Sequence, residues 1–276
     1  MKNQVLLIND LAGYGKVALS AMFPVLAQAG LDIFNLPTAL VSNTLDYGKF
    51  EILETTEYMK KTLAVWKELR FSFDAICTGF ITSEEQTKLI HEYSQAQKAK
   101  GTWIFVDPIM GDDGKLYNGI SQQHVSYMRE LCAVADVIVP NFTEAALLAE
   151  MYQERTNISR EEGRKLIEKL RMLGSESVIV TSARVDGKDM VIGYDGKKEI
   201  YFEIPFEYVP VRFPGTGDIF SAILISRVLT GAQLKDAVKI AMNVVRKLIL
   251  LNQKNSDKYK GILIEKNLEV LNFEET

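Results

Sequence analysis

Short apolar runs alternate with longer helical patterns through most of this 276-residue chain, and this alternation constrains the fold more than any other feature. β-Branched and apolar runs predict strands, and apolar residues at helical spacing predict helices. The expected strands are Val5–Ile8, Asp74–Thr78, Trp103–Val106, Val137–Val139 and Val178–Thr181. The expected helices are Ala18–Ala29, Thr56–Leu69, Glu84–Lys100, Gln122–Ala133, Thr143–Met151 and Arg160–Leu173. This order predicts an α/β fold whose mostly parallel sheet is covered by helices on both faces.

Two segments interrupt the alternation. Ile33–Val41 predicts an extra strand pair that forms an edge or a lid. Met190–Tyr194 and Glu199–Ile204 flank Asp195-Gly196, a dipeptide that favours a tight hairpin turn because both residues tolerate positive φ.

The last third of the chain predicts helices at Asp218–Thr230 and from Leu234 to about Leu251, with Gly231 as a stop signal between them. No repeat or flexible linker divides the sequence. We therefore expect residues 1–276 to form a single domain.

Composition excludes several classes of protein. The formal net charge is −4 without a basic stripe, which argues against nucleic acid or an anionic membrane surface as partner. Cys77 and Cys132 have no neighbours at ligand-like spacing, so we expect buried thiols. No apolar run is long enough to span a bilayer, and the N-terminus lacks the pattern of a signal peptide. A cytoplasmic location is expected.

The strongest chemical signal is Phe213-Pro214-Gly215-Thr216-Gly217-Asp218, followed at once by an apolar helix. Glycines let the backbone approach a ligand, and the N–H groups at a helix start stabilise a phosphate. A carboxylate at the same turn can take a proton from an attacking hydroxyl. The alternative is that Asp218 is an acidic first-turn residue favoured by the helix dipole, and that the glycines serve only the turn.

Further polar residues follow other expected strands. Asp107, Asn141 and Glu144 are placed by their strands at the same rim, where oxygen ligands suit Mg²⁺ carried in with a nucleotide. Thr181 and Ser182 end another strand and can hydrogen-bond nucleotide phosphates. Each of these motifs alone is also compatible with a turn or a helix cap.

The glycines after the first strand, Gly13-Tyr14-Gly15-Lys16, satisfy neither familiar nucleotide loop. A dinucleotide fingerprint needs a third glycine where Ala18 stands, and a P-loop needs an earlier glycine and a hydroxyl after the lysine. An NAD-dependent enzyme is therefore disfavoured.

Together these motifs resemble a known family over nearly the whole chain. The segments that carry the likeness are Asn9 to Gly15, Ser42-Asn43-Thr44, Thr78-Gly79-Phe80, Asp107-Pro108-Ile109-Met110-Gly111-Asp112, Pro140-Asn141 with Glu144, Thr181-Ser182 and Gly215-Thr216-Gly217-Asp218. This order is similar to the pyridoxal kinase branch of the ribokinase superfamily. The last tetrad marks the superfamily, and the Asp-Pro-x-Met-Gly-Asp stretch is more specific to vitamin B6 and hydroxymethylpyrimidine kinases.

The resemblance implies a fold and an activity. The fold would be a ribokinase-like three-layer α/β/α sandwich with a small β lid. The protein would be an ATP- and Mg²⁺-dependent kinase for the 5′-hydroxyl of pyridoxal, pyridoxine or pyridoxamine, and a homodimer. A requirement for a monovalent cation stays open.

The resemblance also assigns roles to residues. Asp218 would be the general base, and Gly215, Thr216 and Gly217 would line the anion hole. Asp107 and Glu144 would organise the metal. The nucleotide would be bound by Asp112, Tyr117, Asn141, Thr181 and Ser182, together with Thr216 and Gly217. The substrate would contact Asp10, Tyr14, Thr44, Phe80 and Asp218.

The sequence departs from the better-known pyridoxal kinases in the substrate pocket. Asp10 stands where those enzymes have a serine, and Thr44 is shifted relative to their threonine. A carboxylate at position 10 can pair with a protonated pyridine nitrogen or with an amine, but it also resembles the acid of hydroxymethylpyrimidine kinases. That activity is the nearest alternative. A sugar kinase and a non-catalytic ligand-binding protein on the same fold are more distant ones.

Overall fold

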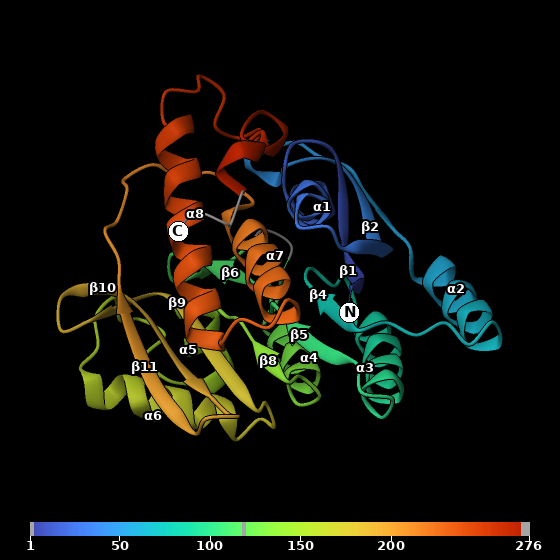
Figure 1. The fold of residues 1–276 in the computed structure, drawn as a ribbon, viewed down its shortest axis with the longest axis horizontal. Coiled ribbons are helices and arrows are strands. Elements are labelled where there is room, and N and C mark those ends of the chain that lie inside the picture. Colours follow the sequence, from blue (N-terminus) through green and yellow to red (C-terminus); the bar gives the residue numbers. More distant parts are fainter. Residues whose placement is uncertain (1–2, 118–119, 272–276) are drawn as a thin grey trace. The chain divides into compact units, whose positions relative to one another are not determined.

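The computed structural model describes residues 3–117 and 120–271. The chain forms two compact units, which are described separately. Unit 1 contains Met1–Thr82 and Val209–Thr276, and unit 2 contains Ser83–Tyr208. In Figure 1, unit 1 therefore comprises both ends of the colour bar and unit 2 its middle.

Unit 1 is built on four strands. They are β1 (Gln4–Tyr14), β2 (Asp32–Asn43), β3 (Ile52–Glu54) and β4 (Ala75–Thr78), in the order β4-β1-β2-β3. β1 is parallel to both neighbours, whereas β3 is antiparallel to β2. Residues 5–8 of β1 are completely buried, as expected for a parallel strand covered on both faces.

Three helices of unit 1 pack on one another. α1 (Ala18–Gln28) contacts α7 (Thr216–Leu229), and α7 contacts α8 (Leu234–Asn252) (Figure 1). Residues 218–226 of α7 are all buried, which is typical of a helix surrounded by protein. α2 (Thr56–Glu68) packs beside β2. Short 3₁₀ turns occur at Leu45–Tyr47, Ile264–Lys266 and Leu268–Leu271.

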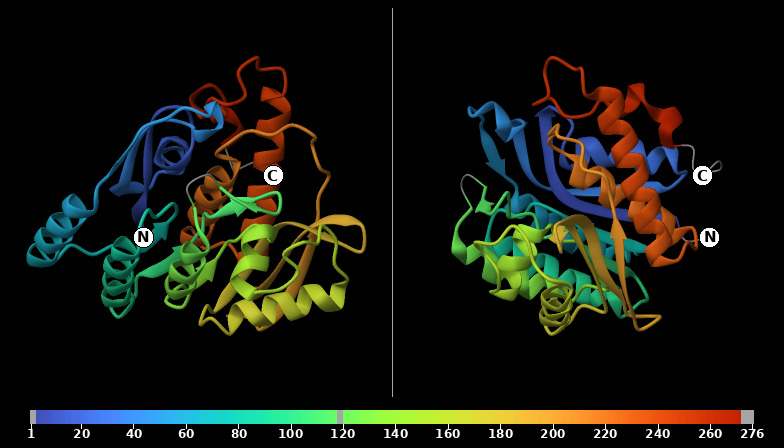
Figure 2. Two further views of the ribbon diagram at one scale, coloured as in Figure 1. Left: turned by 180° about the vertical axis from the view of Figure 1, so that it is seen from behind. Right: turned by 90° about the vertical axis from the view of Figure 1, so that its left-hand side faces the viewer.

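Unit 2 has its own strands and helices. The strands, in spatial order, are β11 (Ile200–Pro205), β10 (Lys188–Asp195), β9 (Ser177–Val185), β8 (Val137–Ile138) and β5 (Trp103–Val106). The helices are α3 (Glu84–Lys98), α4 (Gln122–Cys132), α5 (Phe142–Ala149) and α6 (Arg160–Arg171). Each helix contacts the next along the chain, and Figure 2 shows them side by side, coloured from green to yellow. β6 (Gly111–Asp112) and β7 (Lys115–Leu116) form a separate hairpin.

Most predicted elements are confirmed, and so is the α/β class with mostly parallel strands. The strand pair predicted within Ile33–Val41 is wrong, because this segment is a single stretch of β2 that pairs with β1 in parallel and with β3 at its far end. The apolar alternation within β2 indicated strand structure correctly but could not reveal that no turn interrupts it.

The hairpin of β10 and β11 is confirmed, and its connection lies one residue later than the expected strand bounds gave. Asp195 pairs with Ile200, so four residues connect the strands. Asp195 Oδ1 accepts hydrogen bonds from the backbone N–H groups of Lys197 (3.1 Å) and Lys198 (3.2 Å), and Glu199 takes the positive φ of 55°. The aspartate side chain therefore stabilises the connection between the two strands.

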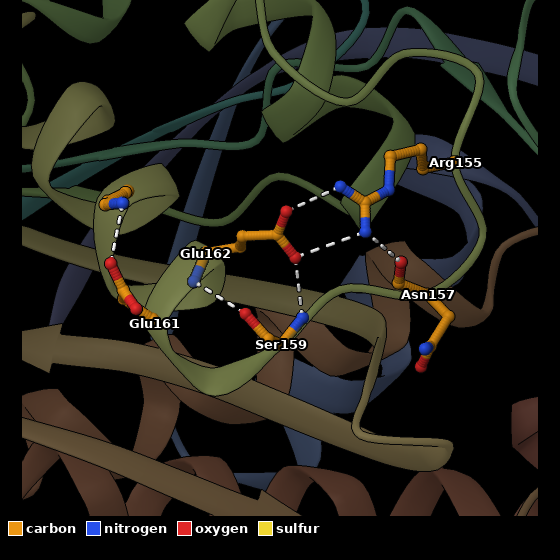
Figure 3. A network of polar contacts seen from close by, with 6 residues as sticks. Arg155, Asn157, Ser159, Glu161 and Glu162 are labelled. Atoms are coloured by element: carbon orange, nitrogen blue, oxygen red, sulfur yellow. Dashed lines mark hydrogen bonds and ion pairs between the residues drawn. The ribbon is translucent and has the colours of Figure 1, made fainter.

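The start of α6 shows how this chain closes a helix N-terminus with its own side chains (Figure 3). Ser159 Oγ accepts a hydrogen bond from the Glu162 N–H (3.2 Å), and Glu162 Oε2 accepts one from the Ser159 N–H (2.8 Å). Arg155 Nη1 donates to Glu162 Oε1 (2.6 Å). These contacts satisfy the N–H groups of Ser159 and Glu162 at the helix start.

Across residues 3–117 and 120–271, every helix is too short or too polar to cross a lipid bilayer.

Candidate active site

The turn that begins α7 requires a glycine at position 215. Gly215 is the N-cap residue, with a φ of 84°, and a Cβ there would lie 2.2 Å from the carbonyl oxygen of Lys16. Both the left-handed backbone and the close approach exclude a larger side chain. The close approach of Lys16 and the positive φ therefore explain why the predicted turn has a glycine at position 215.

The N-terminus of α7 lacks the closure seen at α6. Its N-cap residue, Gly215, has no side chain with which to cap the first turn. Gly217 is exposed, and a Cβ added to it would meet no atom within 4 Å. The first amides of this 14-residue helix therefore face open space, where the helix dipole favours a negative charge.

Asp218 lies in the same turn and is buried. Its Oδ2 accepts a hydrogen bond from the backbone N–H of Ala18 (2.8 Å), the first residue of α1, and its Oδ1 accepts one from Asn9 Nδ2 (3.3 Å). Burial raises the pKa of Asp218 to about 6, and these two hydrogen bonds oppose the rise. At neutral pH the group is a carboxylate with a pKa suited to accepting a proton.

Asp10 is a second buried carboxyl group near Asp218. Burial and the charge of Asp218 raise the pKa of Asp10 to about 7. The structure therefore brings together two of the acids predicted from sequence, and it sets their pKa values in the range where protons are exchanged near neutral pH.

Asn9 is the residue that sequence reasoning did not assign to the site. It is buried, and it contacts Asp218 on one side and the backbone of Phe80 and Asp10 on the other. The sequence feature that could have identified Asn9 is its position as a polar residue directly after a fully buried apolar strand segment. In the structure, Gly79 lies opposite and leaves room for its side chain.

The other predicted substrate contacts also lie in unit 1. Phe80 is half-buried, and Tyr14 is exposed. Thr44 is buried, and its Oγ1 donates a hydrogen bond to the carbonyl oxygen of Tyr259 (2.7 Å). The hydroxyl of Thr44 thus holds the C-terminal segment, which its strand-end position did not indicate.

An aromatic group surrounds Tyr14. Its ring lies 6.0 Å from that of Tyr47, which in turn lies 5.6 Å from that of Tyr259. Lys260 Nζ lies 4.9 Å from the Tyr14 ring centre, in cation–π geometry. Residues far apart in sequence therefore build the surface beside the predicted substrate position.

Unit 2 contains the acidic residues predicted for the metal. Glu144 is buried, with Oε1 accepting from the Met110 N–H (3.0 Å) and Oε2 from the Asn141 N–H (2.9 Å). Burial, and then the charge of Asp107, raise the pKa of Glu144 well above its usual value. Glu144 therefore ties the loop after Asp107 to the start of α5, as the helix-cap alternative anticipated.

Several residues of unit 2 that were predicted to bind the nucleotide lie in these same loops and are connected by backbone and side-chain contacts. Asn141 Nδ2 donates to the Gly111 carbonyl (2.8 Å), which joins α5 to the hairpin that carries Asp112. Asn141 also forms a parallel bridge with Thr181. Ser182 is exposed and has a φ of 54°. The N–H of Tyr117, which follows β7, donates to the Met110 carbonyl (2.9 Å).

The acidic pair Asp107 and Glu144 does not form a complete metal site. In the described part of the chain, no three His, Cys, Asp or Glu side chains gather to hold a metal ion. The donors present are carboxylate oxygens, which Mg²⁺ prefers, and Mg²⁺ in nucleotide sites keeps water and phosphate oxygens as its other ligands. The residues fit a metal that arrives with a nucleotide.

Comparison with known proteins gives a family and several relatives. A family model described as phosphomethylpyrimidine kinase matches residues 27–263. The chain is 29% identical over 214 residues to a pyridoxal kinase of Arabidopsis thaliana, covering 75% of this chain and 67% of that protein. It is 27% identical over 270 residues to a pyridoxal kinase of Paraburkholderia xenovorans, covering 90% of this chain and 88% of that one.

Solved structures are also similar. A Bacteroides thetaiotaomicron protein assigned to the phosphomethylpyrimidine kinases and crystallised with pyridoxal is 32% identical, with a TM-score of 0.92 over 98% of this chain and 96% of that one. The pyridoxal kinase of Lactobacillus plantarum is 26% identical, with a TM-score of 0.87 and the same coverage.

Proposed function

Because this chain belongs to the phosphomethylpyrimidine kinase family, we propose that it phosphorylates the 5′-hydroxyl of a vitamin B6 vitamer with ATP as donor. Relatives in this family named as pyridoxal kinases, and a similar structure crystallised with pyridoxal, support this choice of substrate. They also support the resemblance to the pyridoxal kinase branch that the motifs indicated.

One observation carries the proposal. The buried carboxylate of Asp218 stands in the first turn of α7, directly beside amides that the N-cap residue, Gly215, has no side chain to cap. A hydroxyl acceptor and a phosphoryl group need these two elements at one point: a base for the proton and an electropositive site for the transferred group.

In this mechanism Asp218 accepts the proton of the 5′-hydroxyl as its oxygen attacks the γ-phosphorus, and the bond from the γ-phosphorus to the β,γ-bridging oxygen breaks to release ADP. The amides at Gly215, Thr216 and Gly217 stabilise the charge on the transferred group. With a pKa raised to about 6, Asp218 is ionised at neutral pH yet basic enough to take the proton.

The residues proposed to bind ATP are Asp112, Tyr117, Asn141, Thr181 and Ser182, together with Thr216 and Gly217. Asp107 and Glu144 would organise Mg²⁺. When bound, Mg²⁺ neutralises charge on the β- and γ-phosphates.

Asp10 supports a heterocyclic substrate rather than a sugar. A buried carboxyl with a pKa of about 7 can pair with a protonated pyridine nitrogen or with the amine of pyridoxamine. Hydroxymethylpyrimidine is the second candidate, because the matched family model is described as phosphomethylpyrimidine kinase. The pyrimidine ring can also pair with the carboxyl group of Asp10.

The proposal is tested by an ATP-coupled assay over pyridoxal, pyridoxamine, pyridoxine, hydroxymethylpyrimidine and ribose. Turnover with one or more B6 vitamers is expected. Turnover with hydroxymethylpyrimidine alone would move the chain to the second function, and turnover with ribose alone would refute both.

We also infer a cytoplasmic homodimer. Exposed apolar side chains along β2 and β3, among them Phe34, Leu40 and Leu53, offer an edge that a second copy could cover. Light scattering of the purified protein gives the mass directly, and a monomer at micromolar concentration would contradict the dimer.

A further inference from the structure

We propose that Asn9 is a positioning residue that orients the carboxylate of the base Asp218 through a donated hydrogen bond. The inference rests on the proposed function, in which Asp218 accepts the substrate proton. It concerns a residue of β1 that neither the motifs nor the resemblance assigns to a role.

The orientation of the Asn9 amide is determined by its neighbours. Asn9 Oδ1 accepts hydrogen bonds from the backbone N–H groups of Phe80 (2.7 Å) and Asp10 (3.0 Å). Since backbone N–H groups can only donate, the oxygen must face them, and Nδ2 must face the other way. Nδ2 is thereby directed at Asp218 Oδ1, 3.3 Å away, and it also lies 3.9 Å from Met22 Sδ.

The surrounding backbone leaves this side chain little freedom. Asn9 is 2% exposed, and a Cβ at Gly79 would lie 2.3 Å from Asn9 Nδ2. Gly79 therefore provides the space that the amide occupies. Packing and two hydrogen bonds therefore fix the position of Asn9 Nδ2 independently of Asp218.

The two oxygens of Asp218 are then held from two sides. Oδ1 receives the Asn9 amide, and Oδ2 receives the Ala18 N–H at 2.8 Å. A donated hydrogen bond stabilises the carboxylate form, so Asn9 keeps Asp218 ionised against the effect of burial. The same amide holds Phe80 and Asp10, both expected at the substrate, and therefore links the acceptor position to the base.

Two substitutions separate the parts of this role. Asn9→Asp is nearly isosteric and keeps an oxygen for the Phe80 and Asp10 amides, but it replaces the N–H that faces Asp218 with an oxygen and adds a negative charge there. Asn9→Leu removes both functions. The matched control is Asn252→Leu, because Asn252 is a buried asparagine of the same unit whose Nδ2 donates to the Leu248 carbonyl (2.9 Å).

The first readout needs no substrate. A ¹³C-carboxyl NMR titration, assigned with Asp218→Asn, measures the pKa of Asp218 in each protein. We expect the pKa of Asp218 to rise by about 1 pH unit in Asn9→Leu, the size of one hydrogen bond to a charged group, to rise further in Asn9→Asp because of the added like charge, and not to change in Asn252→Leu.

The second readout is the pH profile of kcat with the vitamer that the wild type uses. The acidic limb should move to higher pH by about 1 unit in Asn9→Leu and by more in Asn9→Asp, and kcat near pH 6.5 should fall about threefold in Asn9→Leu, because the ionised fraction of Asp218 falls by that factor. Asn252→Leu should lower thermal stability without moving the limb.

An Asp218 pKa that changes by less than about 0.3 pH unit in Asn9→Leu, on the scale of the single hydrogen bond expected here, would refute the inference. So would an equal shift in Asn252→Leu. If the wild type phosphorylates no B6 vitamer, the proposed function fails, and the NMR titration still decides whether Asn9 controls Asp218.

Discussion

The Oδ2 atom of Asp218 accepts a hydrogen bond from the backbone N–H of Ala18 at 2.8 Å, so the first turns of α7 and α1 share one carboxylate. This contact fixes the acid without using a second side chain. It also means that substitution of Asp218 affects both the proposed chemistry and the packing of two helices.

Asp218→Asn should abolish most activity while preserving the site. The asparagine Oδ1 can still accept the Ala18 N–H, but the side chain no longer accepts a substrate proton. Turnover should fall by about 10² to 10⁴, the usual contribution of a positioned base. ATP affinity measured by calorimetry should stay within about threefold, since proton transfer contributes to the transition state rather than to ground-state binding. Unchanged turnover would remove Asp218 from the mechanism.

Gly217→Ala separates the proposed anion site from folding. An added Cβ meets no protein atom within 4 Å, and alanine is favoured over glycine within a helix, so stability should be unchanged or slightly higher. The methyl group would intrude where the phosphate is expected, and turnover should fall at least about tenfold, corresponding to about 1.4 kcal/mol. Full activity together with normal stability would argue against phosphate binding at this turn.

Gly215→Ala is the counterpart in which folding itself should suffer. The Cβ would lie 2.2 Å from the Lys16 carbonyl oxygen, and the backbone would keep a φ of 84°. A left-handed non-glycine residue costs about 1 kcal/mol before the collision is counted. Thermal unfolding should show a lower Tm than in Gly217→Ala, and equal Tm values would contradict the close approach.

Asp10→Asn should change how stability depends on pH. The folded state raises the pKa of Asp10 to about 7 from 3.8, so it binds the proton more tightly than the unfolded chain does. Stability is therefore greatest below about pH 4 for this group and is lost as the pH rises toward and through 7. The variant lacks this loss, so its Tm should match that of the wild type near pH 4 and exceed it by at least about 2 °C at pH 8. A lower Tm than the wild type at pH 8 would show that Asp10 is stabilised as an anion.

Glu144→Ala should destabilise unit 2. It leaves the buried amides of Met110 and Asn141 without their carboxylate acceptor, a loss of about 2 kcal/mol. Tm should fall by about 4 to 8 °C in thermal unfolding. The exposed Glu154→Ala is the control and should stay within about 0.5 kcal/mol. Equal effects of the two would mean that Glu144 does not hold this loop.

Local patterns predicted the elements well where one residue type decides the geometry. The apolar run of Val5–Ile8 could only be a buried strand, and Gly215 with Asp218 indicated a helix start because glycine is needed at positive φ and an acid is favoured in the first turn. The segment Ile33–Val41 was predicted less well, because its residues favour strand structure without showing that one continuous strand, β2, runs through it.

By itself, the sequence determined the α/β class, the order of its elements and the glycine turn beside Asp218, since these follow from spacing and backbone preference along a short stretch. Only the tertiary structure decided which groups surround that acid: Asn9 lies 209 residues earlier, yet it donates to Asp218. Burial likewise depends on the whole fold, and burial is what raises the pKa values of Asp10 and Asp218 toward neutrality. The sequence supplies the carboxyl group of Asp218, whereas its pKa, and so its ability to accept a proton, is set by neighbours that only folding brings into contact.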